Sequence, residues 1–422
     1  MKPSAETTSA ITKMARCEWV MKKTNSHNQN CSSLYNREEV GAKDEQNPKT
    51  FANETKDSPM RPSLVCPSMR LRLYRHHKML RALLLFAFAL TCVVFAGHVE
   101  PVLGNTDGVT SIFRALSQPA QEIKELSLLV LATCSAIFVV VADLLVYAII
   151  RFRHRVGDEA SEPPQIYGSN QIETAWTVLP ILIVFVLILV TSRTIADIQD
   201  RKAPPGAIHS TVVGHQWWWE IRYPELGIVT ANELHVPASD GNRRQPTFLN
   251  LESADVAHSF WVPQLAGKTD LIPNRENRMW IEPTQPGTYL GNCAEYCGMQ
   301  HARMLLRVIV QPPAEFEQWV KEQQQSAFED ASATEGRKIF FANSCVSCHA
   351  IRGTSAQGAF GPDLTHLMSR QTLASGAAPL SHDSLRAWVR DPQQLKVGCL
   401  MPNMQITDQE VDQIVAYLET LK

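Results

Sequence analysis

The twelve residues from 293 to 304 carry four soft metal donors, which are Cys293, Cys297, His301 and Met304. Thiolate, thioether and imidazole groups together form the donor set of copper electron-transfer sites. One Cys, one His and one Met suit a single copper ion, and a second thiolate four residues from the first allows two sulfurs to bridge two coppers. A further side-chain ligand then has to come from a distant strand, and His258 is the best candidate. The fold is therefore expected to bring residue 258 against the 293–304 segment; a disulfide between the two cysteines is the alternative.

A second cofactor motif occupies residues 345–349, where Cys345, Cys348 and His349 form a C-x-x-C-H sequence. This is the attachment signature of c-type haem, in which both thiols bind the porphyrin and the adjacent His ligates iron. Two methionines compete for the sixth iron position: Met401, which precedes a proline, is preferred, and Met404 is the reserve. His/Met ligation suits a low-spin electron carrier with a raised potential. A zinc site would need a second ligand pair, and none is well placed.

The segment after these methionines predicts a C-terminal helix. Thr407 and Glu410 have the spacing of a capping box. Apolar residues then recur at helical spacing, at Val411, Ile414, Val415, Leu418 and Leu421.

Two apolar stretches predict a transmembrane hairpin, with spans at about residues 126–150 and 174–194. At about 1.5 Å per residue, the first span is long enough to cross a hydrocarbon core of about 30 Å with some tilt. Three arginines, Arg151, Arg153 and Arg155, lie in the connection and indicate that it is cytoplasmic. Because c-type haem is attached outside the cytoplasm, both ends of the hairpin are expected to face outward.

The N-terminal part reads as two segments outside the functional domains. Residues 1–68 are polar with no sustained periodicity, which indicates a disordered or mis-annotated extension. Residues 69–97 contain a basic run followed by the apolar run 82–96, the order of a secretory signal peptide. We therefore expect translation to begin at Met69 or Met79, and a retained extra membrane anchor is the alternative.

After the hairpin segment (98–204), short alternating runs with Pro and Gly between them predict a β-sandwich or barrel over residues 205–312. Leu249 and Leu251, for example, alternate with polar residues. Pro312 and Pro313 end this pattern, and a polar, Gln-rich, helix-prone linker follows over residues 313–332. The haem motif then lies in a second exported domain, residues 333–422.

Bulk properties limit the classes of function. A chain of 422 residues is expected to form two or three domains. Its net charge of −2 gives no indication of nucleic-acid binding. Four of the ten cysteines lie in the two cofactor motifs and the others are scattered, so they do not form a disulfide framework.

These motifs together resemble subunit II of the haem-copper cytochrome c oxidases of the caa3 type, in which a cytochrome c domain is fused to a copper domain. The resemblance covers roughly residues 100–422. It implies a multidomain membrane protein with a two-helix transmembrane hairpin, an all-β cupredoxin sandwich and an all-α class I cytochrome c domain.

The resemblance also implies a binuclear copper A centre and one covalent haem c. Its copper ligands would be bridging Cys293 and Cys297, with His258 and Met304 on one copper and His301 and the backbone carbonyl of Glu295 on the other. The Glu295 side chain would reach a magnesium ion at the border with subunit I. In the haem domain, a loop at residues 361–364 resembles the one whose proline carbonyl steadies the axial His.

Two further roles are implied by the same resemblance. Trp217, the first of three consecutive tryptophans, would receive the electron from cytochrome c, whereas core packing explains Trp219. Glu173 opens the second span at the position where the family has the entrance of a proton channel into subunit I. A helix-start carboxylate favoured by the helix dipole is the other interpretation of Glu173.

The function that the resemblance implies is electron transfer in a respiratory oxidase. An external cytochrome c or other periplasmic donor would reduce the fused haem c, and copper A would pass the electron to haem a of subunit I, where O2 is reduced to water with proton pumping. The partners would be subunit I (haem a, haem a3 and copper B), subunit III and membrane lipid, in a bacterial inner membrane with the copper and haem domains on the periplasmic face. A flexible tether would raise the effective concentration of the donor haem to about the millimolar range.

Three other classes of protein share part of this pattern. A nitrous oxide reductase has a similar copper cluster but needs a large propeller domain, for which this chain has no room. A quinol oxidase subunit II keeps the fold and loses the copper ligands. The alternative from a different class is a non-catalytic copper- and haem-binding electron carrier or assembly protein. A protein that only binds copper or assists assembly would need neither the covalent haem nor the tryptophan run.

Overall fold

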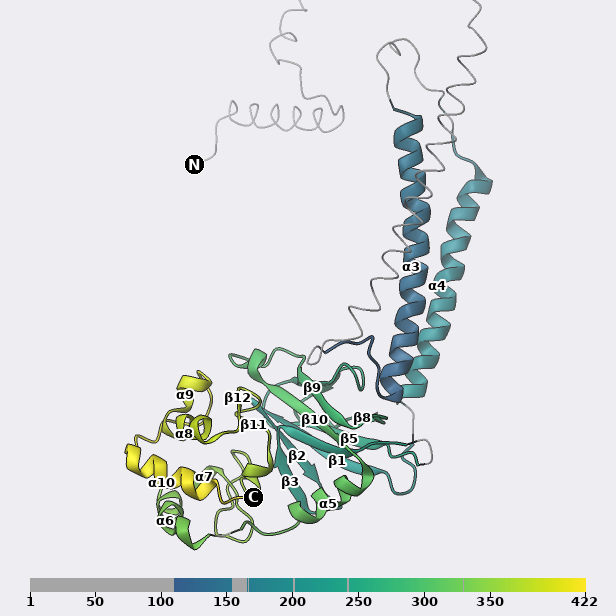
Figure 1. The fold of residues 1–422 in the computed structure, drawn as a ribbon. Coiled ribbons are helices and arrows are strands. Elements are labelled where there is room, and N and C mark those ends of the chain that lie inside the picture. Colours follow the sequence, from purple (N-terminus) through teal and green to yellow (C-terminus); the bar gives the residue numbers. More distant parts are fainter. Residues whose placement is uncertain (1–109, 154–164, 166, 200–201, 241–242, 329) are drawn as a thin grey trace, which may run out of the picture. The chain divides into compact units, whose positions relative to one another are not determined.

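The computed structural model describes residues 110–153, 165, 167–199, 202–240, 243–328 and 330–422 (Figure 1). The expected N-terminal extension (1–68) and signal segment (69–97) lie outside the described residues. The same is true of Arg155 in the connection between the two spans.

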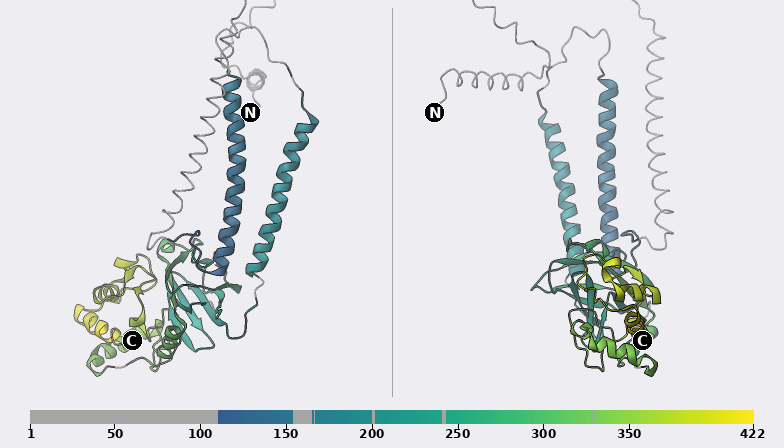
Figure 2. Two further views of the ribbon diagram at one scale, coloured as in Figure 1. Left: turned by 45° about the vertical axis from the view of Figure 1, so that its right-hand side comes forward. Right: turned by 90° about the vertical axis from the view of Figure 1, so that its left-hand side faces the viewer.

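Two long helices, α3 (Gln118–Arg151) and α4 (Asn170–Gln199), lie side by side in Figures 1 and 2. Their 34 and 30 residues exceed the length needed to cross about 30 Å of hydrocarbon. In the most apolar stretch of each helix no residue is buried by the rest of the described chain, so these apolar side chains need contact with something outside it. This is the environment that lipid or a partner's helices provide, and the predicted transmembrane hairpin is confirmed.

Both helices are hydrogen-bonded to the β-domain where they meet it. The Ser117 hydroxyl, just before α3, accepts from the Glu282 backbone N–H at 2.8 Å. Near the end of α4, the Trp280 indole donates to the Ile198 carbonyl at 2.6 Å. Backbone bonds from Leu116 to Gln264 and from Thr284 to Leu116 add to this junction. The β-domain is therefore hydrogen-bonded to the membrane hairpin both at the start of α3 and near the end of α4.

The β-domain is a sandwich of two five-stranded sheets. One sheet has the order β3-β2-β1-β5-β8 and the other β4-β10-β9-β6-β7. The strands are Ile208–His215 (β1), Trp218–Tyr223 (β2), Ile228–Ala231 (β3), Glu233–Pro237 (β4), Thr247–Ser253 (β5), His258–Trp261 (β6), Thr269–Leu271 (β7), Asn277–Ile281 (β8), Gly287–Cys293 (β9) and Leu305–Gln311 (β10).

Side-chain alternation places the core between the two sheets. In β5, Leu249 and Leu251 are fully buried while Asn250 is half-buried, as the period of a strand requires. Trp219 and Phe260 fill the centre, with ring centroids 6.0 Å apart at 84°. The alternating pattern predicted a sandwich or a barrel, and the structure is a sandwich, which confirms the cupredoxin-like fold that the resemblance implied.

Strand register brings the donor residues together. In the second sheet β6 pairs with β9 so that Phe260 lies opposite Cys293, which places His258 two residues from that pair. The 293–304 segment leaves at the end of β9, contains the short helix η1 (His301–Arg303) and returns directly into β10. Its two ends meet through a hydrogen bond from the Cys293 N–H to the Met304 carbonyl at 3.0 Å. The segment is thus a closed loop at one end of the sandwich.

The linker forms the helix α5 (Pro313–Gln323), which packs on the sandwich. Phe316 and Trp319 are buried, and the Trp319 ring stacks on His235 with centroids 4.2 Å apart at 7°. Because the two buried aromatics are three residues apart, they lie on one face of the helix. The expected flexible tether is therefore replaced by an ordered, packed helix over most of the linker.

The C-terminal domain is helical. It contains η2 (Ala331–Ala333), α6 (Thr334–Ala342), α7 (Cys345–Cys348), η3 (Leu367–Ser369), the hairpin β11 (Thr372–Leu373) and β12 (Ala378–Pro379), α8 (His382–Arg390), α9 (Pro392–Leu395) and α10 (Asp408–Leu418). α10 begins with the predicted capping box, in which Thr407 and Glu410 bond reciprocally. α6 crosses α10 closely at Gly336, where a Cβ would lie 1.8 Å from the Gln413 carbonyl oxygen. Only glycine fits at this crossing.

Candidate metal centre and cofactor cavity

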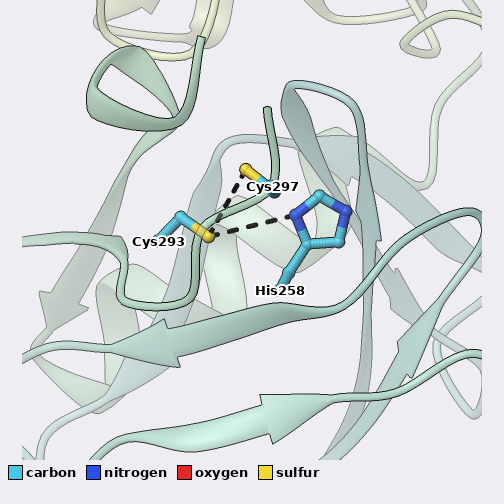
Figure 3. Close-up of side chains that lie close together, drawn as sticks. All are labelled: His258, Cys293 and Cys297. Carbon is cyan, nitrogen blue, oxygen red and sulfur yellow. Dashed lines mark hydrogen bonds between the residues drawn. The ribbon is translucent and has the colours of Figure 1, made fainter. Parts of the chain in front are cut away.

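Three of the predicted copper ligands form a buried cluster at the end of the sandwich (Figure 3). The Cys293 and Cys297 sulfurs lie 3.8 Å apart and are not bonded to each other, so the alternative of a disulfide is not what the structure contains. The His258 Nδ1 lies 3.9 Å from the Cys293 sulfur. The donor atoms of these three residues all lie within 4.8 Å of one another.

The remaining predicted ligands surround the two sulfurs. The His301 Nδ1 lies 3.7 Å from the Cys297 sulfur, and the Met304 sulfur lies 3.8 Å from it. On the other side, the Cys293 sulfur lies 3.1 Å from the Glu295 carbonyl oxygen, while the Glu295 side chain is exposed. All six predicted ligand residues therefore converge on one point, with the Glu295 carbonyl facing inward and its carboxylate facing outward.

Asp255 orients the His258 ring. The His258 Nε2 lies 2.8 Å from an Asp255 carboxylate oxygen, and since a carboxylate only accepts, Nε2 carries the proton. The lone pair of Nδ1 is then directed at the sulfur pair, the arrangement in which an outer carboxylate fixes the tautomer of a metal-ligating histidine. Burial lowers the pKa of His258, but the hydrogen bond that it donates to Asp255, together with the neighbouring Cys293 and the charges of both groups, outweighs burial and the net pKa is raised. Sequence reasoning missed Asp255, although a carboxylate three residues before a ligand was a usable signal.

The two thiols share their protons unequally. The pKa of Cys293 is lowered, first by its hydrogen bond with Cys297, with His258 and backbone groups of Ser259 and Glu295 adding to the effect. The pKa of Cys297 is raised because the neighbouring Cys293 thiolate and burial both disfavour a second negative charge. The pair therefore loses one proton readily and holds the second, and a cation would be needed to stabilise both thiolates.

The haem motif lines a cavity of about 210 Å³ that lies between the C-terminal domain and the tryptophan run of the sandwich. Cys345, Cys348 and His349 all face this cavity. The His349 Nδ1 donates to the Pro362 carbonyl at 2.7 Å, as the family resemblance implied. Burial lowers the pKa of His349, so the ring is neutral and its Nε2 keeps a lone pair. Gly361 permits this contact, because a Cβ there would lie 2.6 Å from the His349 ring.

Both candidate methionines, Met401 and Met404, line the same cavity. The Gln393 side-chain amide donates to the Met401 carbonyl at 3.1 Å and to the Cys399 carbonyl at 3.0 Å, which fixes the loop before Met401. The packing does not choose between the two sulfurs, so Met401 stays a prediction.

Trp217 lies between the two sites. Its indole N–H donates to the Cys297 carbonyl at 3.0 Å, and its side chain also lines the cavity that holds the haem motif. Of its neighbours, Trp219 is fully buried in the sandwich core, as predicted, and Trp218 stacks on His215 with centroids 4.3 Å apart. The tryptophan run therefore contains one core residue and two residues at a domain border.

Glu173 lies apart from both sites, in the first turn of α4, and its side chain is exposed. This position is compatible with a proton-entry role at a partner surface and with a helix-dipole role, so both interpretations remain predictions.

Comparison with known proteins places all three parts of the chain in recognised families. Residues 109–194 match the family "Cytochrome C oxidase subunit II, transmembrane domain" and residues 208–311 match "Cytochrome C oxidase subunit II, periplasmic domain". Residues 333–422 match the family "Cytochrome c".

Full-length relatives decide the family. Cytochrome c oxidase subunit 2 of Alkalihalophilus pseudofirmus is 34% identical over 304 residues, which cover 70% of this chain and 85% of the relative. The chain belongs to the cytochrome c oxidase subunit 2 family. Cytochrome c oxidase subunit 2 of Bacillus subtilis is 32% identical over 337 residues, covering 74% of this chain and 92% of the relative. Among solved structures, the periplasmic domain of cytochrome oxidase subunit II of Bradyrhizobium japonicum is 27% identical, covering 29% of this chain and 97% of that chain with a TM-score of 0.27.

As a cytochrome c oxidase subunit 2, the chain is a component of an oxidoreductase complex and a partner of subunit I. The hairpin anchors it in a membrane and the sandwich is its periplasmic domain. The subunit II domain implies copper A and the cytochrome c domain implies haem c. The class of non-catalytic assembly proteins is thereby disfavoured.

The residues of this subunit 2 fit both implied groups. At the sandwich end, two thiolates, two imidazoles and a thioether converge in a buried position, which is a soft donor set suited to copper. In the cytochrome c domain, the two attachment cysteines and the neutral His349 face one cavity. The Arg370 side chain also lines it, and its buried Nε has no hydrogen-bond partner. A haem propionate would give this Nε–H the acceptor that it lacks among the described residues. Sequence reasoning missed Arg370, because a single arginine in a loop carries no pattern.

Proposed function

We propose that the chain receives electrons from an external donor on its haem c and passes them through copper A to haem a of subunit I, where O2 is reduced to water with proton pumping. When bound, the haem and the copper pair supply one-electron redox chemistry. The chain's own residues hold these groups, exclude water from them and set the path between them.

The observation that carries the proposal is the position of Trp217. On the haem side, Trp217 lines the cavity together with Cys348 and His349. On the copper side, its indole N–H donates to the Cys297 carbonyl at 3.0 Å, and the same carbonyl accepts a second hydrogen bond from the Gln216 side-chain amide at 2.8 Å. An aromatic side chain therefore bridges the two cofactor sites through one hydrogen bond, and we assign Trp217 as the point of electron entry to copper.

The proposed ligand assignment follows the donor geometry. Cys293 and Cys297 are proposed to bridge the two coppers, with His258 and Met304 on one metal and His301 and the Glu295 carbonyl on the other. Without a cation, the negative charge on Cys293 raises the pKa of Cys297. Copper ions bound to both sulfurs would supply the positive charge that stabilises the second thiolate. The exposed Glu295 carboxylate is proposed to reach magnesium at the border with subunit I.

The wider assembly is proposed on the family's pattern. Glu173 is proposed to admit protons to a channel in subunit I, and subunit III to complete the complex in a bacterial inner membrane. The external donor is proposed to be a cytochrome c or another periplasmic electron carrier. The domain limits of the sequence analysis are proposed to stand, with residues 205–312 forming the copper domain and 333–422 the haem domain.

Reduced-minus-oxidised spectra of the purified complex test this function. We expect a low-spin c-type haem band together with near-infrared absorption from a mixed-valence copper pair. After rapid mixing with a reduced donor, the c-type band is expected to change before the near-infrared band. A complex with only one of the two features, or with copper reduced first, contradicts the proposed order.

The choice between Met401 and Met404 gives a separate prediction. Met404→Leu is expected to leave the low-spin spectrum of the haem unchanged, whereas Met401→Leu removes the sixth ligand and produces a high-spin spectrum, because leucine offers no lone pair to iron. Optical and magnetic spectra of the two variants measure this directly. The two variants are matched controls for each other, since both sulfurs line one cavity. A high-spin spectrum in the Met404 variant alone reverses the assignment.

A further inference from the structure

Lys396 joins the haem domain to the copper domain through all three of its donors. Its ammonium group donates to the Trp217 carbonyl at 2.8 Å, to the Arg303 carbonyl at 3.0 Å and to the Ala374 carbonyl at 3.0 Å. Trp217 and Arg303 belong to the copper domain, and Ala374 belongs to the haem domain. An ammonium has three donors and no acceptor, so this arrangement satisfies it completely.

The contact points of Lys396 lie next to the cofactor ligands. Arg303 immediately precedes the copper ligand candidate Met304, and Lys396 lies five residues before Met401 in the loop that reaches the haem cavity. Trp217 is the proposed electron entry. One side chain therefore touches the copper loop, the tryptophan between the sites and a second segment of the haem domain.

Neighbouring contacts join the same two loops. The Gln300 side-chain amide donates to the Val397 carbonyl, and an Arg303 guanidinium N–H donates to the Leu395 carbonyl at 2.8 Å. The Met299 side chain lies over Gly398, where a Cβ would come within 2.4 Å of its sulfur. Residues 299–303 of the copper loop and 395–398 of the haem loop thus form one continuous contact, which we call the loop junction.

The burial of Lys396 indicates a specific role rather than a surface charge. The residue is only 3% exposed, and no salt bridge involves it in the part of the chain that the structure describes. Burial lowers the pKa of Lys396 to about 8. A long charged side chain is seldom fully buried without a carboxylate, and here carbonyl dipoles take that place. An apolar side chain of similar length would pack in the same space but would leave three carbonyls without donors.

A second buried contact prevents rotation about the loop junction. The Glu233 carboxylate on β4, which is fully buried, accepts from the Gln371 N–H at 2.8 Å and from the Thr372 N–H at 2.9 Å. Ser375 and Leu305 exchange two further hydrogen bonds nearby. Two separated attachments fix the orientation of the haem domain, whereas one would leave it free to turn.

We propose that Lys396 is a positioning residue for electron transfer, which holds the haem domain against Trp217 and the copper loop so that the haem-to-copper distance is fixed. This rests on the proposed function. The step concerned moves one electron: reduced haem c is oxidised, oxidised copper A is reduced, and no bond forms or breaks. Transfer is then a first-order event within a docked pair, and the docked state does not depend on diffusion of a tethered domain.

The test uses the complete oxidase purified from membranes, with Lys396→Met as the main variant. Methionine has a similar length but no donors, so the haem domain is expected to lose its fixed position. We expect the first-order rate of electron transfer from haem c to copper to fall at least about tenfold, in keeping with the cost of an ångström-scale misplacement. The c-type and near-infrared bands are expected to be unchanged, because Lys396 ligates neither metal.

Magnetic resonance provides a readout that a general loss of stability does not produce. Oxidised haem c speeds the relaxation of the copper signal in a distance-dependent way, and this effect is expected to weaken in Lys396→Met. The matched control is Lys338→Met on α6 of the same domain, an exposed lysine whose only described partner is Glu335. The control is expected to keep the wild-type rate and relaxation.

The outcomes separate the two levels of proposal. If the wild-type complex shows no transfer from haem c to copper, the proposed function is wrong and this proposal is wrong with it. If the wild type transfers electrons and Lys396→Met keeps its rate and its relaxation, only the role of Lys396 is overturned. Should Lys396→Met fail to assemble, Lys396→Gln decides: its shorter amide cannot reach all three carbonyls, so a wild-type rate in that variant also overturns the role.

Discussion

Substitution of Cys297 by serine is expected to abolish the near-infrared absorption of copper A and to lower oxidase turnover at least about 100-fold, since even outer partners of metal ligands cost 10–100-fold in affinity or activity. Cys297 is the central donor of the cluster. Its sulfur lies 3.8 Å from Cys293, 3.7 Å from the His301 Nδ1 and 3.8 Å from the Met304 sulfur. A serine hydroxyl is a hard donor that stays protonated, so it cannot bridge two coppers.

The fold is expected to survive this change, which makes the result interpretable. The contact to the tryptophan run uses the Cys297 carbonyl, and this group is retained in serine. The c-type haem band of the purified complex should therefore be unchanged while bound copper, measured by metal analysis, falls. Cys134→Ser is the matched control, because Cys134 is an exposed thiol on α3 outside both sites. Normal copper content and turnover in the Cys297 variant would show that this residue is not a ligand.

The sequence predicted that the candidate copper ligands lie close together, and it could do so because most of these donors are local. Four of them lie within one loop, so their chemistry could be recognised before any fold was known. His258 was predicted because two copper ions need one more side-chain ligand than the loop provides. What the sequence could not supply was Asp255 as the residue that orients His258, since this depends on the ring geometry at the start of β6. Local motifs thus indicate candidate ligands, while the residues that orient those candidates depend on the fold.

The contact between the domains could not be predicted for a related reason. Lys396 and Trp217 are 179 residues apart, and Glu233 and Gln371 are 138 apart, with no shared motif. A lysine in a polar loop is usually a surface residue, and nothing in the sequence distinguishes the buried one. The packed linker is an intermediate case. Phe316 and Trp319 have helical spacing, but the surrounding Glu and Gln residues made the segment resemble a solvated tether.

Replacing both Cys345 and Cys348 with serine is expected to remove haem c and, with it, most of the stability of the C-terminal domain. Without thioether bonds the haem is held only by its axial ligands, and the cavity that Cys345, Cys348 and His349 line is left partly empty. Apolar side chains that line this cavity, among them Phe340, Leu385 and Ile414, lose the packing surface that the haem would provide. Because a small domain is only marginally stable, this domain is expected to unfold while the sandwich stays folded.

Three measurements check this result. Haem staining of a denaturing gel should be lost, residues 333–422 should become sensitive to limited proteolysis, and the near-infrared band of copper A should remain. Ser347→Ala is the matched control, because Ser347 lies inside the same motif but is exposed and attaches nothing. Turnover with an external donor is expected to fall in the double variant, since the docked haem is the proposed first acceptor. Retained haem staining would show that these two cysteines do not attach the haem. A protease-resistant domain without haem would show that the folding of this domain does not depend on the haem.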